Sequence, residues 1–436
     1  MASDTIFALS TGGGAAGIAI IRISGPRTKD VLREFAGDVP PARQAALRQI
    51  ADPATGAAID SGVILFFPGP NSFTGEDLAE LQVHGSLAVI RHLLRCLGEQ
   101  LGLRAADAGE FTYRAFLNGK MDLVAVEALG DLLSAETEAQ ARLTRIYQRN
   151  LRQAAATWRE SLLSVLGLTE ASIDFVDEGD IDSEIDSIAE QEIVQLQQEI
   201  RGAISGLATA ERIRRGYRIA ILGPPNAGKS SLINSLAQRD VAITSSIPGT
   251  TRDTIEVHLD LMGLPVVLID TAGLRESTDE LESEGITRAY SAARDADLVL
   301  WLSPTDCPVP SPFERALLVL SKSDAIDSPP ISSIHSPVIS IKTSSGLDDL
   351  IAAMHQRAAL SLNLDADAVL VAHTRQAGEL HAAAEALGRS LSFGAGSLEL
   401  RAEELRVAQR SLDRLTGRIS PDEILGAIFS RFCIGK

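Results

Sequence analysis

Residues 223–230 read GPPNAGKS, a complete G-x-x-x-x-G-K-S loop that follows the short apolar run RIAIL at residues 218–222. A helical pattern begins directly after the loop, at Ser231. A strand that ends in a glycine-rich turn and opens a helix points backbone N–H groups and the positive end of the helix at one spot. Such a spot suits a diphosphate, with Lys229 reaching the outer phosphates and the Ser230 hydroxyl on Mg²⁺. The stretch therefore predicts a P-loop nucleotide-binding domain.

Two further phosphate motifs follow in the order and spacing of a GTPase. Residues 248–253 read PGTTRD and supply a threonine that can sense a γ-phosphate. The apolar run VVLI at residues 266–269 predicts a second buried strand, which ends at DTAG, residues 270–273. An acid there can hold the magnesium shell, and a glycine N–H can meet the γ-phosphate. Three motifs in one register predict a nucleotide switch.

A fourth motif bears on which base is bound. Residues 321–324 read SKSD where GTPases carry N-K-x-D. The Asp324 carboxylate can accept from guanine N1 and N2 together, a contact that adenine cannot make, and Lys322 can lie along the base plane. Ser321 is shorter than the usual Asn, whose amide braces the loop, so we expect weaker guanine binding than in relatives; the alternative is a promiscuous site. Residues 340–342 (SIK) fit the last loop that contacts the base.

The catalytic position is unusual. Ras-like switches place a water-orienting glutamine where this chain has Leu274. A leucine cannot position water, so either hydrolysis is slow or other groups take this role. Several charged residues in or near the switches are available, each with the alternative of being a solvated surface charge. They are Arg252, Arg275, Glu276, Glu280, Glu282 and Glu284.

Bulk properties limit the partners and the compartment. The 436 residues suggest about three domains. A net charge of −18 and a pI near 4.9 oppose strong unspecific binding of nucleic acid, so a local basic patch or a basic partner must deliver any RNA. The absence of an 18-residue apolar run and of a signal peptide predicts a cytoplasmic protein that spans no membrane. Cys96, Cys307 and Cys433 are widely separated, which predicts neither a disulfide framework nor a zinc site.

The regions outside the nucleotide motifs differ in their hydrophobic period. Residues 1–118 hold β-branched runs such as IAIIRI at residues 18–23, which predict an α+β domain rich in strands. Residues 119–215 and 359–436 carry apolar residues at helical spacing and predict two parts of one α-helical domain. Residues 216–358 between them predict an α/β G domain of the Ras-like P-loop type, inserted in a loop of the helical domain.

Three stretches have ordinary structural interpretations when taken by themselves. Residues 73–81, FTGEDLAEL, resemble a helix N-terminus with a capping-box-like start and acids that the helix dipole favours. Residues 109–112 and 114–120 have the pattern of an ordinary helix and turn. Cys433, close to the last residue, has three open interpretations: an inert thiol, a nucleophile or a substrate contact.

Six strings spread over the chain carry a resemblance to one family. They are FTGEDLAELQVHG at residues 73–85, GEFTYRAFLNGKMDL at 109–123, GPPNAGKSSL at 223–232, PGTTRD at 248–253, DTAGLR at 270–275 and the terminal FCIGK. Through them the chain resembles, from end to end, the MnmE (TrmE) family of tRNA-modification GTPases. Related assembly GTPases share the G-domain strings but do not pair them with this N-terminal block and a terminal Cys-Ile-Gly-Lys.

The resemblance implies an activity and its partners. It implies an N-terminal dimerisation domain that binds 5-formyl-tetrahydrofolate or a related folate, a helical domain and an inserted G domain. It also implies a homodimer that works with the flavoprotein MnmG, as a heterotetramer, while the partner holds most of the tRNA. Together they would add a carboxymethylaminomethyl or aminomethyl group to C5 of wobble uridine 34 in certain tRNAs. The alternative is a ribosome-assembly or regulatory GTPase that binds RNA and modifies nothing.

The resemblance also implies roles for particular residues. A potassium ion replaces the arginine finger in this family, and its expected ligands are Asn226, Ser245, Ile247 and Thr250. Ser230 and Thr251 match the magnesium ligands, and Glu282 matches the acid that positions water. Cys433 matches the cysteine required for modification. The folate contacts align with Arg22, Glu80, Lys120 and Lys436.

The expected nucleotide site draws on four segments of the G domain. Its residues are Asn226, Ala227, Gly228, Lys229, Ser230, Ser231, Ser245, Ser246, Ile247, Pro248, Gly249, Thr250, Thr251, Asp270, Thr271, Ala272, Gly273, Ser321, Lys322, Ser323, Asp324, Ser340, Ile341 and Lys342.

Overall fold

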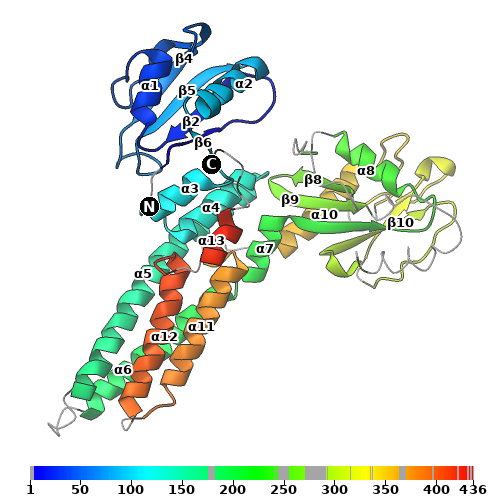
Figure 1. The fold of residues 1–436 in the computed structure, drawn as a ribbon. Helices are drawn as coiled ribbons and strands as arrows, with labels where there is room; N and C mark the ends of the chain where they lie inside the picture. The colour runs from blue at the N-terminus through cyan, green and yellow to red at the C-terminus, as the bar shows by residue number, and fades with distance from the viewer. Residues whose placement is uncertain are drawn as a thin grey trace, which may run out of the picture. The chain divides into compact units, whose positions relative to one another are not determined.

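The chain folds into two compact units (Figure 1). One unit comprises Met1–Gly130 with Asp413–Lys436, and the other comprises Asp131–Leu412. The computed structural model describes residues 4–174, 182–239, 241–243, 255–270, 291, 293–314, 316–333, 335, 337–362, 370–394, 397–419, 422–429, 432 and 435. Among the helices described, none combines the length and the hydropathy needed to cross a bilayer.

The first unit is built on a six-stranded sheet with the order β3-β4-β5-β2-β1-β6. The pairs are antiparallel except for β1 and β6, which run parallel. The strands are β1 (Ile6–Leu9), β2 (Ala16–Ser24), β3 (Ala46–Ala51), β4 (Ala58–Phe67), β5 (Leu78–Gly85) and β6 (Arg104–Ala105).

The alternation of buried and more exposed residues along the strands explains which face of this sheet the helices cover. Ile21 and Ile23 of β2 are fully buried with Leu81 of β5, and the residues between them are more exposed. These side chains share one hydrophobic cluster with residues of α1 (Thr28–Ala36) and α2 (Leu87–Arg95). Both helices therefore pack on the same face of the sheet, as expected when every second strand residue is apolar.

The expected helix N-terminus at residues 73–81 is wrong. Residues Leu78–Gly85 form β5, which pairs with β2 on one side and β4 on the other. Ala79, Leu81 and Val83 are buried at a period of two, so burial on the sheet face outweighs the local capping pattern.

Three helices complete the first unit. They are α3 (Glu110–Leu117), α4 (Leu123–Ser134), which continues beyond the unit's boundary, and α13 (Asp422–Phe429). Leu123 and Val126 of α4 pack with Leu425, Phe429 and Phe432 in a small aromatic cluster. Residues far apart in the sequence thus share one core.

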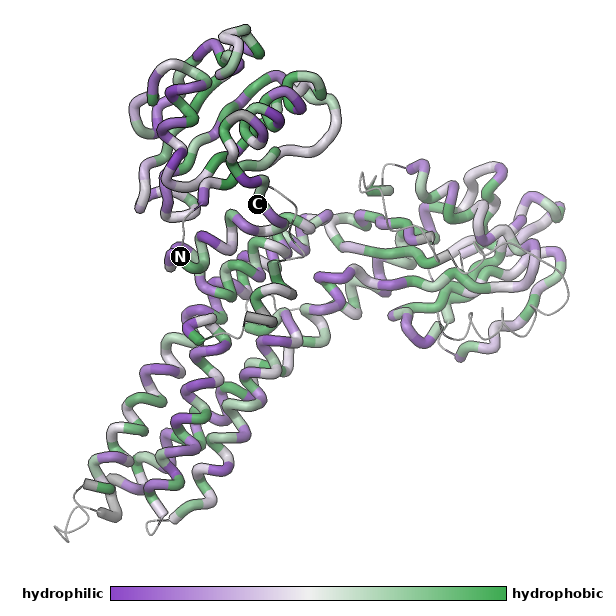
Figure 2. Tube along the Cα trace, in the orientation of Figure 1, coloured by the Kyte–Doolittle hydropathy of each residue, from purple (hydrophilic) through white to green (hydrophobic). Residues whose placement is uncertain are grey.

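Long helices dominate part of the second unit. They are α5 (Glu138–Asp174), α6 (Asp182–Ile204), α11 (Thr374–Ser390) and α12 (Leu398–Thr416), whose last turn lies beyond the unit's boundary, together with the shorter α7 (Leu207–Arg215). Figure 2 shows hydrophobic and hydrophilic residues alternating along them, as expected of helices with one buried face. The helical period expected on both sides of the nucleotide motifs is therefore present.

The same unit contains a five-stranded sheet with the order β11-β10-β7-β9-β8. The strands are β7 (Tyr217–Leu222), β8 (Ile255–Leu261), β9 (Leu264–Asp270), β10 (Leu298–Pro304) and β11 (Leu317–Ser321). All neighbours run parallel except β8 and β9. The accompanying helices are α8 (Lys229–Ala237) and α10 (Leu347–Ser361).

The centre of this sheet fixes the place of the candidate site. Ile219, Ala220 and Ile221 of β7 are fully buried, a continuous apolar run typical of an inner parallel strand. Strand β7 pairs with β9 on one side and with β10 on the other. Ligands of open parallel sheets bind beyond the carboxyl ends of strands at such a reversal of strand order.

Candidate nucleotide-binding site

The P-loop occupies the carboxyl end of β7, as predicted. Gly223 follows the strand with φ 152°, and a Cβ at this position would lie 2.1 Å from the Leu302 carbonyl oxygen of β10. Only glycine fits this close approach of two backbones. Asn226 and Gly228 adopt left-handed conformations with φ 60° and 97°, and Gly228 is the N-cap residue of α8. The turn therefore ends at the positive end of a helix.

Side chains in and just after the loop are placed for anion binding. The Lys229 ammonium donates hydrogen bonds to the carbonyl oxygens of Gly223 (3.1 Å) and Pro224 (3.0 Å), so it lies over the loop. Ser230 and Asn226 are exposed, while Ala227 is fully buried. Phosphate oxygens are stronger acceptors than carbonyls, so a bound phosphate would draw the ammonium from these contacts.

The segments expected to bind the base are brought together. Asp324 lies in a 3₁₀ turn (Ser323–Ala325) directly after β11, and the Ser340 hydroxyl donates to its Oδ1 at 2.6 Å. This hydrogen bond is the main reason why the pKa of Asp324 lies below its usual value, with nearby Lys342 and Lys322 also lowering it. Asp324 and Lys322 are exposed, and Ser340 is buried. The carboxylate is thus held ionised and accessible.

Ser321 links the base segment to the phosphate loop, a role that the sequence pattern did not reveal. Its side chain is fully buried, and its hydroxyl donates to the Ala227 carbonyl oxygen at 2.8 Å. The shorter side chain therefore still braces the P-loop, because β11 ends within hydrogen-bonding reach of it. The only earlier signal was the position of Ser321 in the SKSD motif.

Part of the expected nucleotide site lies outside the described residues. The backbone of Asp270 is described, and it ends β9 opposite Ile221 of β7. The expected site residues outside the description are Ser245, Ser246, Ile247, Pro248, Gly249, Thr250, Thr251, Thr271, Ala272, Gly273, Glu282, Cys433 and Lys436.

Two of the expected folate contacts face each other in the first unit. Arg22 of β2 and Glu80 of β5 are directly opposite in the strand register and form an ion pair at 2.8 Å. The guanidinium carbon of Arg22 lies 5.5 Å from the ring centroid of Phe73 and 5.8 Å from that of Phe111. Lys120 is exposed just after α3. A carboxylate, cations and aromatic faces fit a flat heterocycle with an anionic tail.

An ionic network at α3 was missed in the sequence analysis, which treated this stretch as ordinary helix and turn. Arg114 is nearly buried and contacts Asp4 (2.6 Å), Glu110 (3.0 Å) and Glu76 (3.1 Å). Burial raises the pKa of Glu110, but hydrogen bonds from Arg104, the Asp107 N–H and Arg114 outweigh it, so the pKa lies below its usual 4.5. No local signal could have found this network, because its members are up to 110 residues apart.

The sheet order, the P-loop at the strand reversal and the braced base segment together define a P-loop nucleotide-binding protein of the GTPase type. Two family models cover almost the whole chain. The model described as "GTP-binding protein TrmE N-terminus" matches residues 5–120, and that described as "MnmE helical domain" matches residues 123–433.

Curated relatives extend the match to full length. Proteins called tRNA modification GTPase MnmE from Azorhizobium caulinodans and Beijerinckia indica are each 46% identical, over 435 and 437 residues. The alignments cover 100% and 99% of this chain and 99% and 96% of those proteins. One from Granulibacter bethesdensis is 45% identical over 447 residues and covers 100% of both chains. The chain therefore belongs to the MnmE (TrmE) family.

Among solved structures, the G domain of the T. maritima FeoB iron transporter is 24% identical and covers 32% of this chain and 98% of that chain. The TM-score of 0.23 is too low to support any conclusion about this chain.

Proposed function

We propose that this chain is a GTP hydrolase of tRNA wobble-uridine modification. In this role, with the flavoprotein MnmG, it adds a carboxymethylaminomethyl or aminomethyl group to C5 of uridine 34. The methylene comes from the one-carbon unit of 5-formyl-tetrahydrofolate or a related folate, and the nitrogen comes from glycine or ammonium. The observation that carries the nucleotide part is the buried Ser321 hydroxyl on the Ala227 carbonyl, which ties the base segment to the phosphate loop. The likeness to relatives called tRNA modification GTPase supports the rest.

Each end of the nucleotide has a partner in this proposal. Asp324 accepts hydrogen bonds from the guanine edge, and Lys229 binds the outer phosphates. Magnesium would be held by Ser230 and Thr251; the exposed Ser230 hydroxyl in the first turn of α8 fits a hard cation that prefers oxygen. Bound Mg²⁺ would neutralise charge that develops on the β- and γ-phosphates. Glu282 then orients the attacking water. Ras-like switches use a glutamine for this purpose, at the position where this chain has Leu274.

Potassium is the proposed substitute for an arginine finger. Its ligands would be Asn226, Ser245, Ile247 and Thr250. Asn226 fits, because it is exposed in a left-handed turn of the P-loop and carries an amide oxygen. A positive charge between the β- and γ-phosphates is the role in which arginine fingers accelerate hydrolysis roughly 10³–10⁵-fold.

The proposal also includes the assembly and the division of the chain. Residues 1–118 form a folate-binding dimerisation domain, 119–215 and 359–436 form the helical domain, and 216–358 form the inserted G domain. Arg22, Glu80, Lys120 and Lys436 contact the folate, and Cys433 takes part in the modification. The chain is a cytoplasmic homodimer that joins the flavoprotein MnmG, and the partner holds most of the tRNA.

The deciding experiment measures GTP turnover at saturating Mg²⁺ in potassium and in sodium buffer, over a range of protein concentrations. We expect fast turnover only in potassium, with a specific activity that rises as dimers form. Asn226→Ala should abolish the potassium effect while GDP affinity stays close to that of the unmodified protein. Equal, slow turnover in both salts would contradict the potassium mechanism.

A second assay addresses the modification itself. The chain, its flavoprotein partner with a reductant for the flavin, GTP, a tetrahydrofolate one-carbon donor, glycine or ammonium and an unmodified tRNA should together give a C5-modified wobble uridine, detected by nucleoside mass spectrometry. Potassium-stimulated hydrolysis without modified uridine and without folate binding would favour the assembly-GTPase alternative.

A further inference from the structure

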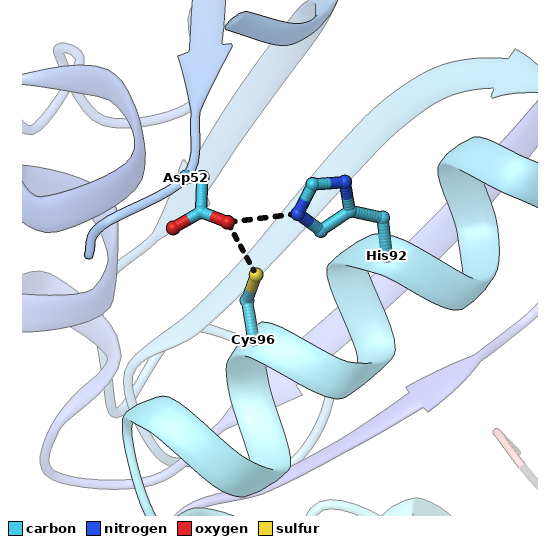
Figure 3. A group of neighbouring side chains, drawn as sticks. All are labelled: Asp52, His92 and Cys96. Carbon is cyan, nitrogen blue, oxygen red and sulfur yellow. Dashed lines mark hydrogen bonds and ion pairs between the residues drawn. The ribbon is translucent and has the colours of Figure 1, made fainter. Parts of the chain in front are cut away.

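Three side chains with metal-binding chemistry meet in the first unit, and none of them is among the residues proposed for nucleotide or folate. Asp52 directly follows β3, His92 lies on α2, and Cys96 begins the π-helical turn Cys96–Gln100 that continues α2. Figure 3 shows the three side chains pointing toward one another. His92 Nε2 lies 2.8 Å from Asp52 Oδ2, and Cys96 Sγ lies 3.7 Å from the same oxygen.

The spacing of these atoms is close to that of a tetrahedral zinc site. One potential ligand atom from each residue lies within 4.8 Å of the others. Zinc bonds of about 2.0–2.3 Å place neighbouring tetrahedral ligands about 3.3–3.8 Å apart. The sulfur–oxygen distance already lies in this range. For zinc to bind, the nitrogen–oxygen distance must increase by about 0.5 Å. His92 can make this movement because its side chain is 35% exposed.

The local backbone orients two of the three groups in advance. Asp52 Oδ1 accepts hydrogen bonds from the N–H groups of Ala54 (2.9 Å) and Thr55 (3.2 Å), which leaves Oδ2 directed at His92 and Cys96. His92 and Cys96 are four residues apart, so they share one side of a helix. Hydrogen bonds that fix a ligating carboxylate are a regular feature of metal sites.

The donor set selects the kind of ion. Imidazole nitrogen and thiolate sulfur suit zinc and cobalt, whereas Mg²⁺, Ca²⁺ and K⁺ prefer oxygen ligands alone. We propose that Asp52, His92 and Cys96 bind one Zn²⁺ through Oδ2, Nε2 and Sγ, with water as the fourth ligand. Binding transfers the thiol proton of Cys96 to solvent and requires the neutral His92 ring to carry its proton on Nδ1. The ion joins the end of β3 to α2 and the turn that continues it, across 40 and 44 residues of chain.

The count of cysteines argued against a zinc site, because three widely separated thiols cannot form a cysteine-rich centre. A site with a single cysteine lacks that pattern. Such a site becomes visible only in the folded chain, where the turn that follows β3 lies next to α2.

The test uses the full-length chain, stripped with a chelator and then titrated with Zn²⁺ in competition with a chromophoric chelator. We expect one tightly bound Zn²⁺ per chain. Substituting Co²⁺ should give the near-ultraviolet thiolate-to-cobalt charge-transfer absorption of a cysteine ligand. Cys96→Ala should remove this absorption and weaken zinc binding at least about 10-fold, the smaller of the losses seen when supporting residues of metal sites are removed.

Matched controls separate ligation from a change in charge or thiol content. Cys307→Ser removes an exposed thiol elsewhere, and His84→Ala removes the exposed His84–Asp60 pair of the same sheet. Both controls should keep the cobalt spectrum and the affinity for zinc. His92→Ala, at a partly exposed position, serves if Cys96→Ala does not fold. Zinc should raise the melting temperature of the unmodified chain and not that of His92→Ala.

Failure of the chain to compete with the chelator for Zn²⁺ would overturn the proposal. So would an unchanged cobalt spectrum in folded Cys96→Ala. In either case the cluster is an ordinary hydrogen-bonded group at the edge of the core.

Discussion

At the scale of single residues, one buried hydroxyl links the segment proposed to bind the base to the P-loop. Ser321 donates to the Ala227 carbonyl oxygen at 2.8 Å from a fully buried position. A buried acceptor that loses its donor costs about 1–3 kcal/mol. The serine therefore keeps a bracing function in the motif position where GTPases usually carry asparagine.

Ser321→Ala should for this reason weaken GDP binding by a factor of about 5–30, which corresponds to 1–2 kcal/mol. Isothermal titration calorimetry with GDP measures this change in affinity. Ser311→Ala is the control, because the Ser311 hydroxyl accepts a hydrogen bond from Phe313 within its own turn. Unchanged GDP affinity in Ser321→Ala would show that the P-loop keeps its conformation without this brace.

Asp324 provides a test of base recognition at the same scale. In the proposed function its carboxylate accepts two donors from guanine, and hydrogen bonds to charged groups contribute about 1.5–3 kcal/mol each. Asp324→Asn should weaken GTP binding at least about 100-fold, as computed from two such bonds, and should favour XTP, whose C2 carbonyl accepts from the new amide. Asp327→Asn, an exposed acid in the same loop, is the matched control. Retained preference for GTP over XTP would place base recognition elsewhere.

At the scale of elements, the sequence predicted what is encoded locally and missed what distant segments decide. The strand, turn and helix of the P-loop were correctly predicted because β7 is a continuous apolar run and Gly223 meets a backbone constraint. The interpretation of residues 73–81 as a helix start was wrong, since pairing of β5 with two neighbouring strands cannot be detected from nine residues. The Arg114 network and the Asp52 cluster were missed for the same reason.

The Arg114 network predicts how the first unit responds to acid. The pKa of Glu110 lies below its usual 4.5, and a hydrogen bond from Arg104, opposed by burial, lowers that of Asp4 below 3.8. Carboxyl groups with lowered pKa values stabilise the folded state fully above their unfolded values and lose this contribution as the pH falls through the folded values. The first unit should therefore be stable near neutral pH and loosen below about pH 4.5.

Arg114→Met should destabilise the first unit by about 3 kcal/mol near neutral pH, because it leaves the nearly buried Glu110 and the half-buried Glu76 without their partner. The difference from the unmodified chain should shrink as the pH falls below about 4, when the acids become neutral. Hydrogen exchange of peptides from residues 4–120 in the full-length chain, compared at matched pH, measures both effects. Arg33→Met, which breaks an exposed ion pair on α1, is the control. A difference that stays constant with pH would mean that Arg114 acts by packing alone.

At the scale of the whole molecule, the net charge bears on the proposed role with tRNA. The sequence has 58 acidic and 40 basic residues. A visible run of arginines closes α7, yet Arg212 and Arg215 both pair with Asp297, at 3.1 and 3.0 Å. One carboxylate thus opposes two guanidinium charges, so this run is partly neutralised.

The chain alone should accordingly bind tRNA weakly. At physiological salt we expect a dissociation constant no lower than the range of roughly 10⁻⁴–10⁻⁶ M that is typical of unspecific contacts. The flavoprotein partner that we propose should tighten binding and make it steeply salt-dependent, because phosphate contacts by a basic surface release counterions. Fluorescence anisotropy with labelled tRNA, measured for the chain, the partner and their mixture over a range of potassium chloride concentrations, separates the contributions. Nanomolar binding by the chain alone with a steep salt dependence would instead locate a basic tRNA site on this chain, and the division of labour between the two proteins would be wrong.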